Sequence, residues 1–328
     1  MTSIHWAVLG CGQIAQTFMQ SVAKVRHAKV VACAASNEVR AKLFAREYDI
    51  VEYYDSYQTM LNAPNIDAVY IATTHNFHYE QIIMCLNHGK HVLCEKPLTL
   101  NAQQAERVFA LAEHKKLLLI EAVWTRFLPA IQSMQAQLKD NILGEIKSVY
   151  ANFSLNVDVD ESHRLKNPML AGGALLDLGI YPITLSDLVF TCDPVKITSS
   201  VIRSSTKVDE NSFYTLEYTD GKTAQLSTGF TISRPTEAVI SGDKGFIKIP
   251  HFLGAQQYEM SIDGQASQIH QYPFAEGDNF VFEIEHMTQI LLSGELRSQV
   301  HSTQSTMRVM RIMDEIRAQW GLVYPNEY

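Results

Sequence analysis

The stretch Ile4–Phe18, IHWAVLGCGQIAQTF, decides the fold of this chain. A short apolar run ends in Gly10–Ala15 (GCGQIA), and a pattern with helical spacing follows. This is the G-x-G-x-x-A form of a dinucleotide-binding loop, in which Gly10 permits the tight turn and Gly12 lets the backbone approach a pyrophosphate. The helix N-terminus offers backbone N–H groups to the anion. We therefore predict cofactor contacts from Gly10, Gly12, Gln13 and Ile14.

The next predicted strand, Lys29–Ala35, is a continuous apolar run typical of a buried parallel strand. A site specific for NAD usually has an acidic residue at the end of this strand, whereas the 2′-phosphate of NADP requires hydroxyls and a cation. We therefore predict NADP, bound by Ser36 and Arg40. NAD stays open, because Glu38 could reach the ribose after a small shift of register. The alternative for Arg40 is an ordinary solvated helix residue.

Strands and helices alternate up to about residue 120, with Ile66–Ala72 and His91–Cys94 as further strands. This order predicts a doubly wound parallel sheet, in which ligand contacts gather at the carboxyl ends of the strands. The cofactor contacts that we predict at two such ends are Thr73, His75, His78, Glu95 and Lys96. The two histidines could instead suggest a metal site, but no clustered Cys or acidic residues complete a tetrahedral set, so we expect no metal.

Lys96 is the most distinctive residue of these strand ends. Glu95 precedes it and Pro97 fixes the turn after it, so it can reach the ribose and the reacting carbon of a dinucleotide. The alternative is an exposed loop lysine, which is the usual environment of this residue.

The pattern of predicted elements changes beyond residue 122. A succession of strand-like segments follows, among them Glu145–Val157 and Phe246–Pro250, with turn signals such as Asp220-Gly221 between them. A chain of 328 residues also exceeds the usual size of one domain. We predict an α/β protein with a dinucleotide-binding Rossmann domain of residues 1–122 and a substrate-binding α+β domain of residues 123–328, whose large open sheet is mainly antiparallel.

One helical segment interrupts these strands, GGALLDLGIYP at residues 172–182, continuing to about Phe190. Asp177 and Tyr181 are four residues apart, so both project from one face of a segment otherwise dominated by Leu and Ile. Pro182 lacks the N–H that would bond the Leu178 carbonyl, which predicts a kink or loosened turn beside Tyr181. Polar groups on an apolar helix suggest a functional site. The alternative is an ordinary half-buried tyrosine with Asp177 as its cap or ion-pair partner.

The composition narrows the class of partner. Hydrophobic residues make up 46% of the chain, while a formal net charge of -8 and the lack of a Lys/Arg run argue against nucleic acid. No basic region precedes an apolar segment at the N-terminus, and no apolar run approaches 18 residues, so we expect neither a signal peptide nor a membrane partner. The five cysteines form no C-x-x-C pair, and a cytoplasmic location fits best.

In this order, the GCGQIA loop, the Cys94–Pro97 segment and the GGALLDLGIYP helix resemble the Gfo/Idh/MocA oxidoreductases, named for glucose-fructose oxidoreductase and inositol dehydrogenase. The turn Gly242–Gly245 and the strand after it are similar to the substrate-domain sheet of that family. Many members carry histidine where this chain has Tyr181. The tyrosine, together with Glu121–Phe127 (EAVWTRF), resembles the branch of dimeric dihydrodiol dehydrogenases and NADP-dependent D-xylose 1-dehydrogenases.

The resemblance implies that Lys96 and Tyr181 form the catalytic pair and that Asp177 binds or orients the substrate. It also implies a homodimer, or a dimer of dimers, formed through the open sheet. An arginine often follows the second strand in that branch, and this chain has Ser36 there, so the choice between NADP and NAD stays open.

Hydride transfer between an alcohol and a nicotinamide requires a group that removes or supplies the hydroxyl proton. We predict that Tyr181 does so, with Lys96 as the cation that a phenol of pKa about 10 requires. The reverse assignment, in which Lys96 relays the proton and Tyr181 polarises the oxygen, is also open. We expect the substrate pocket to be lined by Trp124, Arg126 and Phe153, although Trp and Phe are equally often core residues.

The predicted function is an NADP(H)-dependent dehydrogenase that acts on a sugar or a cyclic diol. Two alternatives stay open, because a fold can host several activities. A glycosidase that uses tightly held NAD would cleave glycosides with no net change in nicotinamide absorbance. A redox sensor would bind the dinucleotide without catalysis, but the presence of both Lys96 and Tyr181 argues against it.

Overall fold

The computed structural model describes residues 2–325 and residue 327. They form two compact units, the first built from residues 2–99, 103–124 and 275–303 and the second from the other described residues. The predicted boundary at residue 122 lies close to the division after Trp124. The sequence did not predict that residues 275–303 return to the first unit. They do so because helix α8 (Val281–Ser293) packs on the first strand and the first helix.

The first unit is built on a six-stranded parallel sheet in the order β3-β2-β1-β4-β5-β6. Its strands are β1 (Ile4–Leu9), β2 (Ala28–Ala34), β3 (Glu52–Tyr54), β4 (Ala68–Ile71), β5 (His91–Glu95) and β6 (Leu119–Ala122). All four residues of β4 are buried, as expected of a parallel strand covered on both faces. The strand order reverses between β1 and β4, and ligands bind at such a switch point. The predicted doubly wound parallel sheet is confirmed.

The helices of the first unit are α1 (Gln13–Val22), α2 (Glu38–Glu47), α3 (Tyr57–Leu61), α4 (His78–Asn87), α5 (Ala102–Lys115) and α8, with 3₁₀ turns η1 (His75–Phe77) and η7 (Asp278–Phe280). Phe18 of α1 shows how they pack, because its ring stacks on Tyr70 at 4.0 Å and meets Trp6 edge-on. The sequence did not predict β3 and α3, which are too short to show a clear periodicity.

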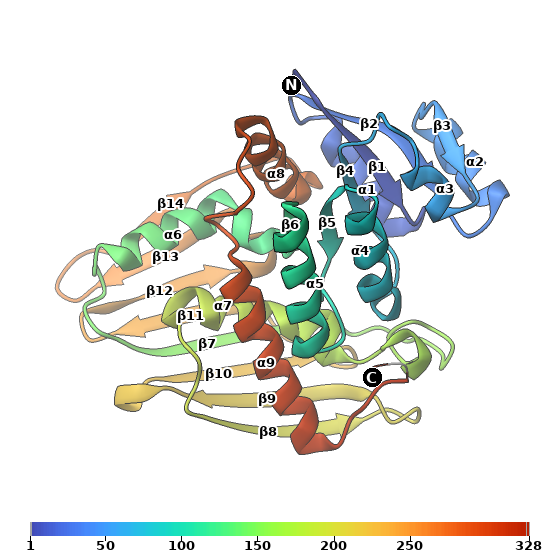
Figure 1. The fold of residues 1–328 in the computed structure, drawn as a ribbon. Helices are drawn as coiled ribbons and strands as arrows, with labels where there is room; N and C mark the ends of the chain where they lie inside the picture. Colours follow the sequence, from blue (N-terminus) through green and yellow to red (C-terminus); the bar gives the residue numbers. More distant parts are fainter. Residues whose placement is uncertain (1, 326, 328) are drawn as a thin grey trace. The chain divides into compact units, whose positions relative to one another are not determined.

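The second unit is built on an eight-stranded sheet in the order β14-β13-β12-β11-β7-β10-β9-β8 (Figure 1). Its strands are β7 (Ile146–Ser154), β8 (Lys196–Arg203), β9 (Asp209–Glu217), β10 (Thr223–Gly229), β11 (Glu237–Gly242), β12 (Gly245–Pro250), β13 (Gln257–Ile262) and β14 (Gln268–Gln271). Every neighbouring pair is antiparallel except β7 and β10, so the predicted mainly antiparallel sheet is confirmed.

Within the second unit, helices α6 (Pro129–Lys139), α7 (Ile180–Phe190) and α9 (Thr303–Trp320) pack on one face of this sheet. Successive side chains of the strands are therefore alternately buried and exposed. Ala224 and Leu226 of β10 are buried beneath the helices, while Gln225 between them is exposed on the other face. Short turns complete the unit at η3 (Pro168–Leu170), η5 (Thr219–Gly221) and η6 (Phe252–Gly254), and η2 (Trp124–Phe127) joins it to the first unit along the chain.

The segment Pro168–Phe190 is long and apolar enough to cross a membrane by length and composition alone. However, 89% of its most apolar window is buried inside the protein. It is therefore the core helix of the second unit, which explains why its apolar residues surround it on all sides.

Candidate active site

The dinucleotide loop joins β1 to α1 at the switch point of the first sheet. Gly10 has a φ of +97°, and a Cβ there would lie 2.8 Å from Cγ2 of Thr73 and 3.1 Å from the Ala72 backbone, so the turn requires glycine. Gly12 is the N-cap of the ten-residue helix α1 and supplies no side-chain cap. The N–H groups of Gln13 and Ile14 lie in the uncapped first turn, and this cradle fits a pyrophosphate.

The loop after β2 carries the residues predicted to select between NADP and NAD. Ser36, Glu38 and Arg40 are all exposed. The Asn37 side chain caps α2 by accepting a hydrogen bond from the Arg40 N–H at 3.2 Å. This cap fixes the start of α2 and the positions of its neighbouring side chains. From there Ser36 and Arg40 can contact the 2′-phosphate of NADP, or Glu38 can contact the 2′-hydroxyl of NAD. Both alternatives remain compatible with the loop.

His78 joins the carboxyl ends of β4 and β5. Its Nδ1 lies 2.8 Å from the Pro97 carbonyl oxygen and its Nε2 lies 3.2 Å from that of Thr73. Burial lowers the pKa of His78, so its ring is neutral and carries one N–H, which we assign to the shorter contact with Pro97. These contacts favour a structural role for His78. Its predicted contact with the cofactor, like that of the buried His75, stays a prediction.

The turn that carries Lys96 is also fixed by Glu121 of β6. The Leu98 N–H donates to Oε1 of Glu121 at 2.8 Å, and Nε2 of His301 lies 3.6 Å from Oε2. Glu95 is directed into the unit, where its carboxylate accepts a hydrogen bond from the Tyr70 hydroxyl at 2.5 Å. The backbone on either side of Lys96 is therefore fixed, while the lysine side chain itself is half-buried. The sequence pattern gave no role to Glu121 or His301.

In the second unit, the GGALLDLGIYP segment forms a π-helical turn, η4 (Leu175–Gly179), that leads directly into α7. The Ile180 N–H bonds the Leu175 carbonyl five residues back, which is the wide spacing of a π-helix. This is the loosened turn expected beside Pro182. Tyr181 is only 5% exposed, and the Phe153 ring meets it edge-on with the centroids 5.7 Å apart. The structure thus places a predicted pocket residue against the predicted acid/base.

Asp177 lies on the π-helical turn and is paired with Arg164. Nη1 of Arg164 lies 2.9 Å from Oδ1 of Asp177, and the two side chains are 50% and 6% exposed. An exposed guanidinium that reaches a buried carboxylate can also contact a polar ligand, so Arg164 joins the candidate site. Arg164 could not be predicted from the sequence because it lies in a loop without a periodic pattern.

Two residues predicted to line the substrate pocket have contacts typical of core packing. Nη2 of Arg126 lies 2.8 Å from Oδ2 of Asp187, with both side chains 2% exposed, and Nε of Arg308 lies 2.6 Å from the other oxygen of Asp187. Trp124, in the first unit, is 8% exposed with its ring centroid 6.0 Å from that of Phe280. These contacts do not support a substrate role for Arg126 or Trp124, and that role stays a prediction.

No group of three or more His, Cys, Asp or Glu residues in the described part of the chain is arranged to hold a metal ion.

A doubly wound sheet with a glycine cradle at its switch point, followed in the chain by a unit with an open mixed sheet, defines a dinucleotide-dependent oxidoreductase of two units. Residues 4–123 match the oxidoreductase family described as an NAD-binding Rossmann fold, and residues 131–248 match the Gfo/Idh/MocA C-terminal domain. The chain belongs to the Gfo/Idh/MocA oxidoreductase family.

Curated relatives and solved structures align with nearly the whole chain. The trans-1,2-dihydrobenzene-1,2-diol dehydrogenase of Xenopus tropicalis is 32% identical, over 98% of this chain and 99% of the relative. The Homo sapiens enzyme of the same name is 30% identical over 99% of both. A 3-ketoreductase from Actinomadura kijaniata, solved with NADP and TDP-benzene, has a TM-score of 0.87 at 27% identity and covers 96% of this chain and 97% of its own. The predicted family and its NAD(P)-dependent dehydrogenase activity are confirmed.

Proposed function

We propose that this protein transfers a hydride between NADP(H) and a secondary alcohol or hemiacetal of a cyclic diol or a sugar. The observation that carries the proposal is the burial of Asp177 and Tyr181 at the π-helical turn of the second unit, in a chain whose first unit carries a dinucleotide cradle. The names of the dihydrodiol dehydrogenase relatives support a diol, and that of the 3-ketoreductase supports NADP-dependent hydride transfer between a ketone and the corresponding secondary alcohol.

When bound, the nicotinamide supplies or accepts the hydride. Tyr181 donates the proton to the substrate oxygen in reduction and removes it in oxidation. A phenol titrates near 10, so the positive charge of Lys96 lowers the cost of the phenolate. In the reverse assignment, Lys96 transfers the proton and Tyr181 polarises the substrate oxygen; the same number of protons is moved. Asp177, with Arg164, orients the hydroxyl groups of the substrate, and Phe153 excludes water from the phenol of Tyr181.

NADP is the proposed cofactor. The exposed Ser36 and Arg40 supply a hydroxyl and a cation beside the end of β2, where a 2′-phosphate binds. The 3-ketoreductase that resembles this chain was solved with NADP, and the same protein was also solved with its lysine or its tyrosine substituted, the two residue types of the proposed catalytic pair.

The proposed assembly is a homodimer formed through the open face of the eight-stranded sheet. A row of cross-strand neighbours on this face includes Ile269, Lys248 and Tyr150, and it mixes charged with exposed apolar side chains. A hollow of about 470 Å³ opens on the same sheet beside Phe213 and Arg234. Light scattering should give twice the mass of the chain for the natural protein and the single mass for Tyr150→Glu. A wild-type monomer would refute the dimer.

A cytoplasmic location completes the proposal. All five cysteines lie in the described part of the chain and are free thiols there, which fits a reducing compartment.

The decisive experiment measures nicotinamide absorbance with NADP and with NAD against a panel of aldoses, inositols and dihydrodiols. We expect turnover with NADP that falls by about 10³-fold in Tyr181→Phe, because the proton is no longer supplied. Dinucleotide affinity should stay unchanged. Tyr53→Phe, at an exposed tyrosine, is the matched control. Full activity of Tyr181→Phe, or silence across the panel while dinucleotide still binds, would overturn the proposal.

A further inference from the structure

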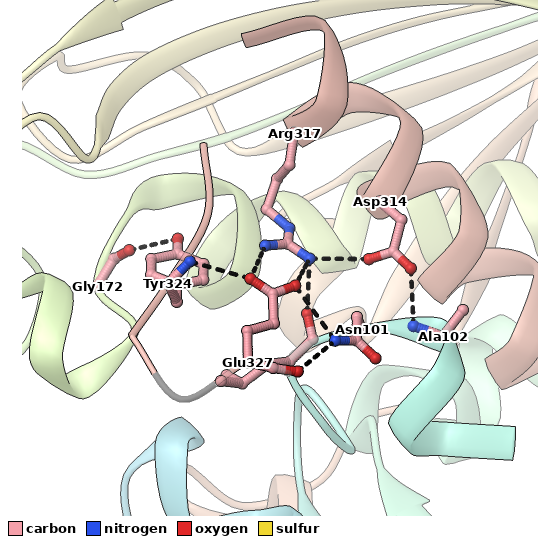
Figure 2. A network of polar contacts seen from close by, with 8 residues as sticks. Asn101, Ala102, Gly172, Asp314, Arg317, Tyr324 and Glu327 are labelled. Carbon is pink, nitrogen blue, oxygen red and sulfur yellow. Dashed lines mark hydrogen bonds and ion pairs between the residues drawn. The ribbon is translucent and has the colours of Figure 1, made fainter. Parts of the chain in front are cut away.

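The C-terminal end of the chain contacts the start of the helical segment that carries Asp177 and Tyr181. Within the second unit, the Tyr324 hydroxyl donates a hydrogen bond to the Gly172 carbonyl at 2.6 Å (Figure 2). Gly173 has a φ of +125°, and a Cβ there would lie 3.0 Å from the Tyr324 hydroxyl and 2.2 Å from Oδ1 of Asp209. Gly173 is therefore required because the side chains of two residues distant in the sequence lie against it, whereas a Cβ at Gly172 would meet the backbone of Arg164 and Leu165.

Tyr324 is itself held through Glu327. The Tyr324 N–H donates to Oε2 of Glu327 at 2.9 Å. Nη1 and Nη2 of Arg317, on α9, lie 2.8 and 2.5 Å from the two oxygens of the same carboxylate (Figure 2). The Asn101 side chain donates to the Glu327 carbonyl at 3.1 Å. One bidentate ion pair therefore fixes the end of the chain against α9.

This ion pair is buried, with the Arg317 and Glu327 side chains 4% and 2% exposed. Burial opposes the charge of both groups, but their mutual attraction outweighs it. The pKa of Arg317 is consequently raised and that of Glu327 lowered. Arg317 also donates to the Leu100 carbonyl and to Asp314, both at 2.9 Å, so its guanidinium has little freedom to move.

Asp209 of β9 holds the same segment from another direction. Its Oδ2 accepts a hydrogen bond at 2.5 Å from the N–H of Leu175, the first residue of the π-helical turn. Tyr324 thus fixes Gly172, shortly before the turn, and Asp209 fixes Leu175, the first residue of the turn. Asp177 and Tyr181 follow two and six positions after Leu175, so a shift of this start would move both.

We propose that Tyr324 and Glu327, fixed by Arg317, are positioning residues that set the start of the π-helical turn and thereby the placement of Asp177 and Tyr181. The catalytic part of this inference rests on the proposed function. Neither Tyr324 nor Glu327 touches the reacting atoms. A tail that only stabilised the fold would change the unfolding temperature of the protein and leave the turnover of the folded enzyme unchanged.

The test compares Tyr324→Phe and Glu327→Gln with two matched controls, Tyr53→Phe and Glu315→Gln, whose side chains are exposed. Tyr324→Phe removes one hydroxyl, and Glu327→Gln weakens the ion pair with little change of shape. Two readouts are needed: hydrogen exchange of the amides of residues 173–181 in the protein without ligand, and kcat with dinucleotide affinity at a temperature where every variant is folded.

We expect faster exchange in residues 173–181 and a fall in kcat of roughly tenfold in both tail variants, because small misplacements of catalytic groups are costly. Dinucleotide affinity and both controls should match the natural protein. Unchanged exchange would overturn the inference, as would faster exchange with a normal kcat. The exchange readout needs no substrate, so it decides the structural contact even if Tyr181→Phe keeps full activity and the proposed function fails.

Discussion

The dinucleotide loop of the first unit and the Gly172–Tyr181 segment of the second unit are both glycine-dependent turns that lead into a helix, but different groups hold them. Gly10 lies against the Thr73 side chain and the backbone of Ala72, just after β4, and its N–H bonds the carbonyl of Ala34 in β2. The second segment also has backbone hydrogen bonds, such as that from the Gly173 N–H to the Leu165 carbonyl, but the side chains of Asp209 and Tyr324, distant in the sequence, hold it as well.

This difference decides how each motif responds to substitution. A parallel sheet supplies backbone neighbours whatever its side chains are, so the first loop depends mainly on its own residues. The second segment depends on groups that lie far away in the sequence. Replacing those distant groups should therefore destabilise the second segment more than comparable changes beside the first loop destabilise that loop.

The largest expected loss of stability is that of Asp187→Ala on α7. The Asp187 carboxylate lies between Arg126 and Arg308, and its removal leaves two like charges in or near the core. Breaking a buried ion pair in this way costs about 3–5 kcal/mol. Urea unfolding measures it, with Glu217→Gln, of the exposed pair with Lys196, as the control expected to cost under about 1 kcal/mol. Equal losses in the two variants would show that burial of the Asp187 pair does not set its contribution to stability.

The next effect is a dependence of stability on pH at Asp209. Burial raises the pKa of Asp209 to about 6 from 3.8, so the folded protein binds this proton more tightly than the unfolded chain does. Its contribution is therefore fully present below pH 3.8 and is lost as the pH rises through about 6. Asp209→Asn lacks this titration.

The stability of Asp209→Asn relative to the natural protein should accordingly rise by about 3 kcal/mol between pH 3 and pH 7. Denaturant unfolding across that range measures the difference, in which the titrations of all other groups cancel. A difference that stays constant with pH would show that Asp209 does not titrate as its burial requires.

A smaller effect is expected for Gly10→Ala in the first loop. The added Cβ meets Thr73 and the Ala72 backbone at a positive φ, so the loop must shift away from the pyrophosphate. We expect NADP to bind about 100-fold more weakly, which corresponds to ~2.7 kcal/mol. Gly89→Ala is the control, because its φ is also positive but nothing lies within 4 Å of the added Cβ. Equal affinities of the two variants, measured by fluorescence titration, would show that the contacts around Gly10 do not govern NADP binding.

The smallest effect is that of Asn37→Ala at the start of α2. The change removes the hydrogen bond from the Arg40 N–H to the capping side chain, which should cost about 1 kcal/mol. Thermal unfolding measures it. Asn62→Ala is the control, since it lies at the other end of a helix and has no capping role at an N-terminus. A loss above that of Asp187→Ala would reverse the ranking on which the comparison depends.

The amino-acid sequence by itself determined the doubly wound sheet, the dinucleotide loop and the mainly antiparallel second sheet. These follow from the spacing of apolar residues, from Gly10 and Gly12 and from turn signals such as Asp220-Gly221, all of which act over a few neighbouring residues. The loosened turn at the GGALLDLGIYP segment was predictable for the same reason, because Pro182 removes a local N–H.

Only the tertiary structure decided which distant groups hold these elements. In the folded protein α8 belongs to the first unit, and Arg164 pairs with Asp177. Arg126 pairs with Asp187, and Tyr324 contacts Gly172. None of these contacts has a signal in the local sequence, because a single side chain in a loop or at the chain end carries no periodicity. The polar contacts form where the packing of apolar faces buries at least one partner, such as Asp177 or Asp187, which must then find its hydrogen-bonding partner within the fold.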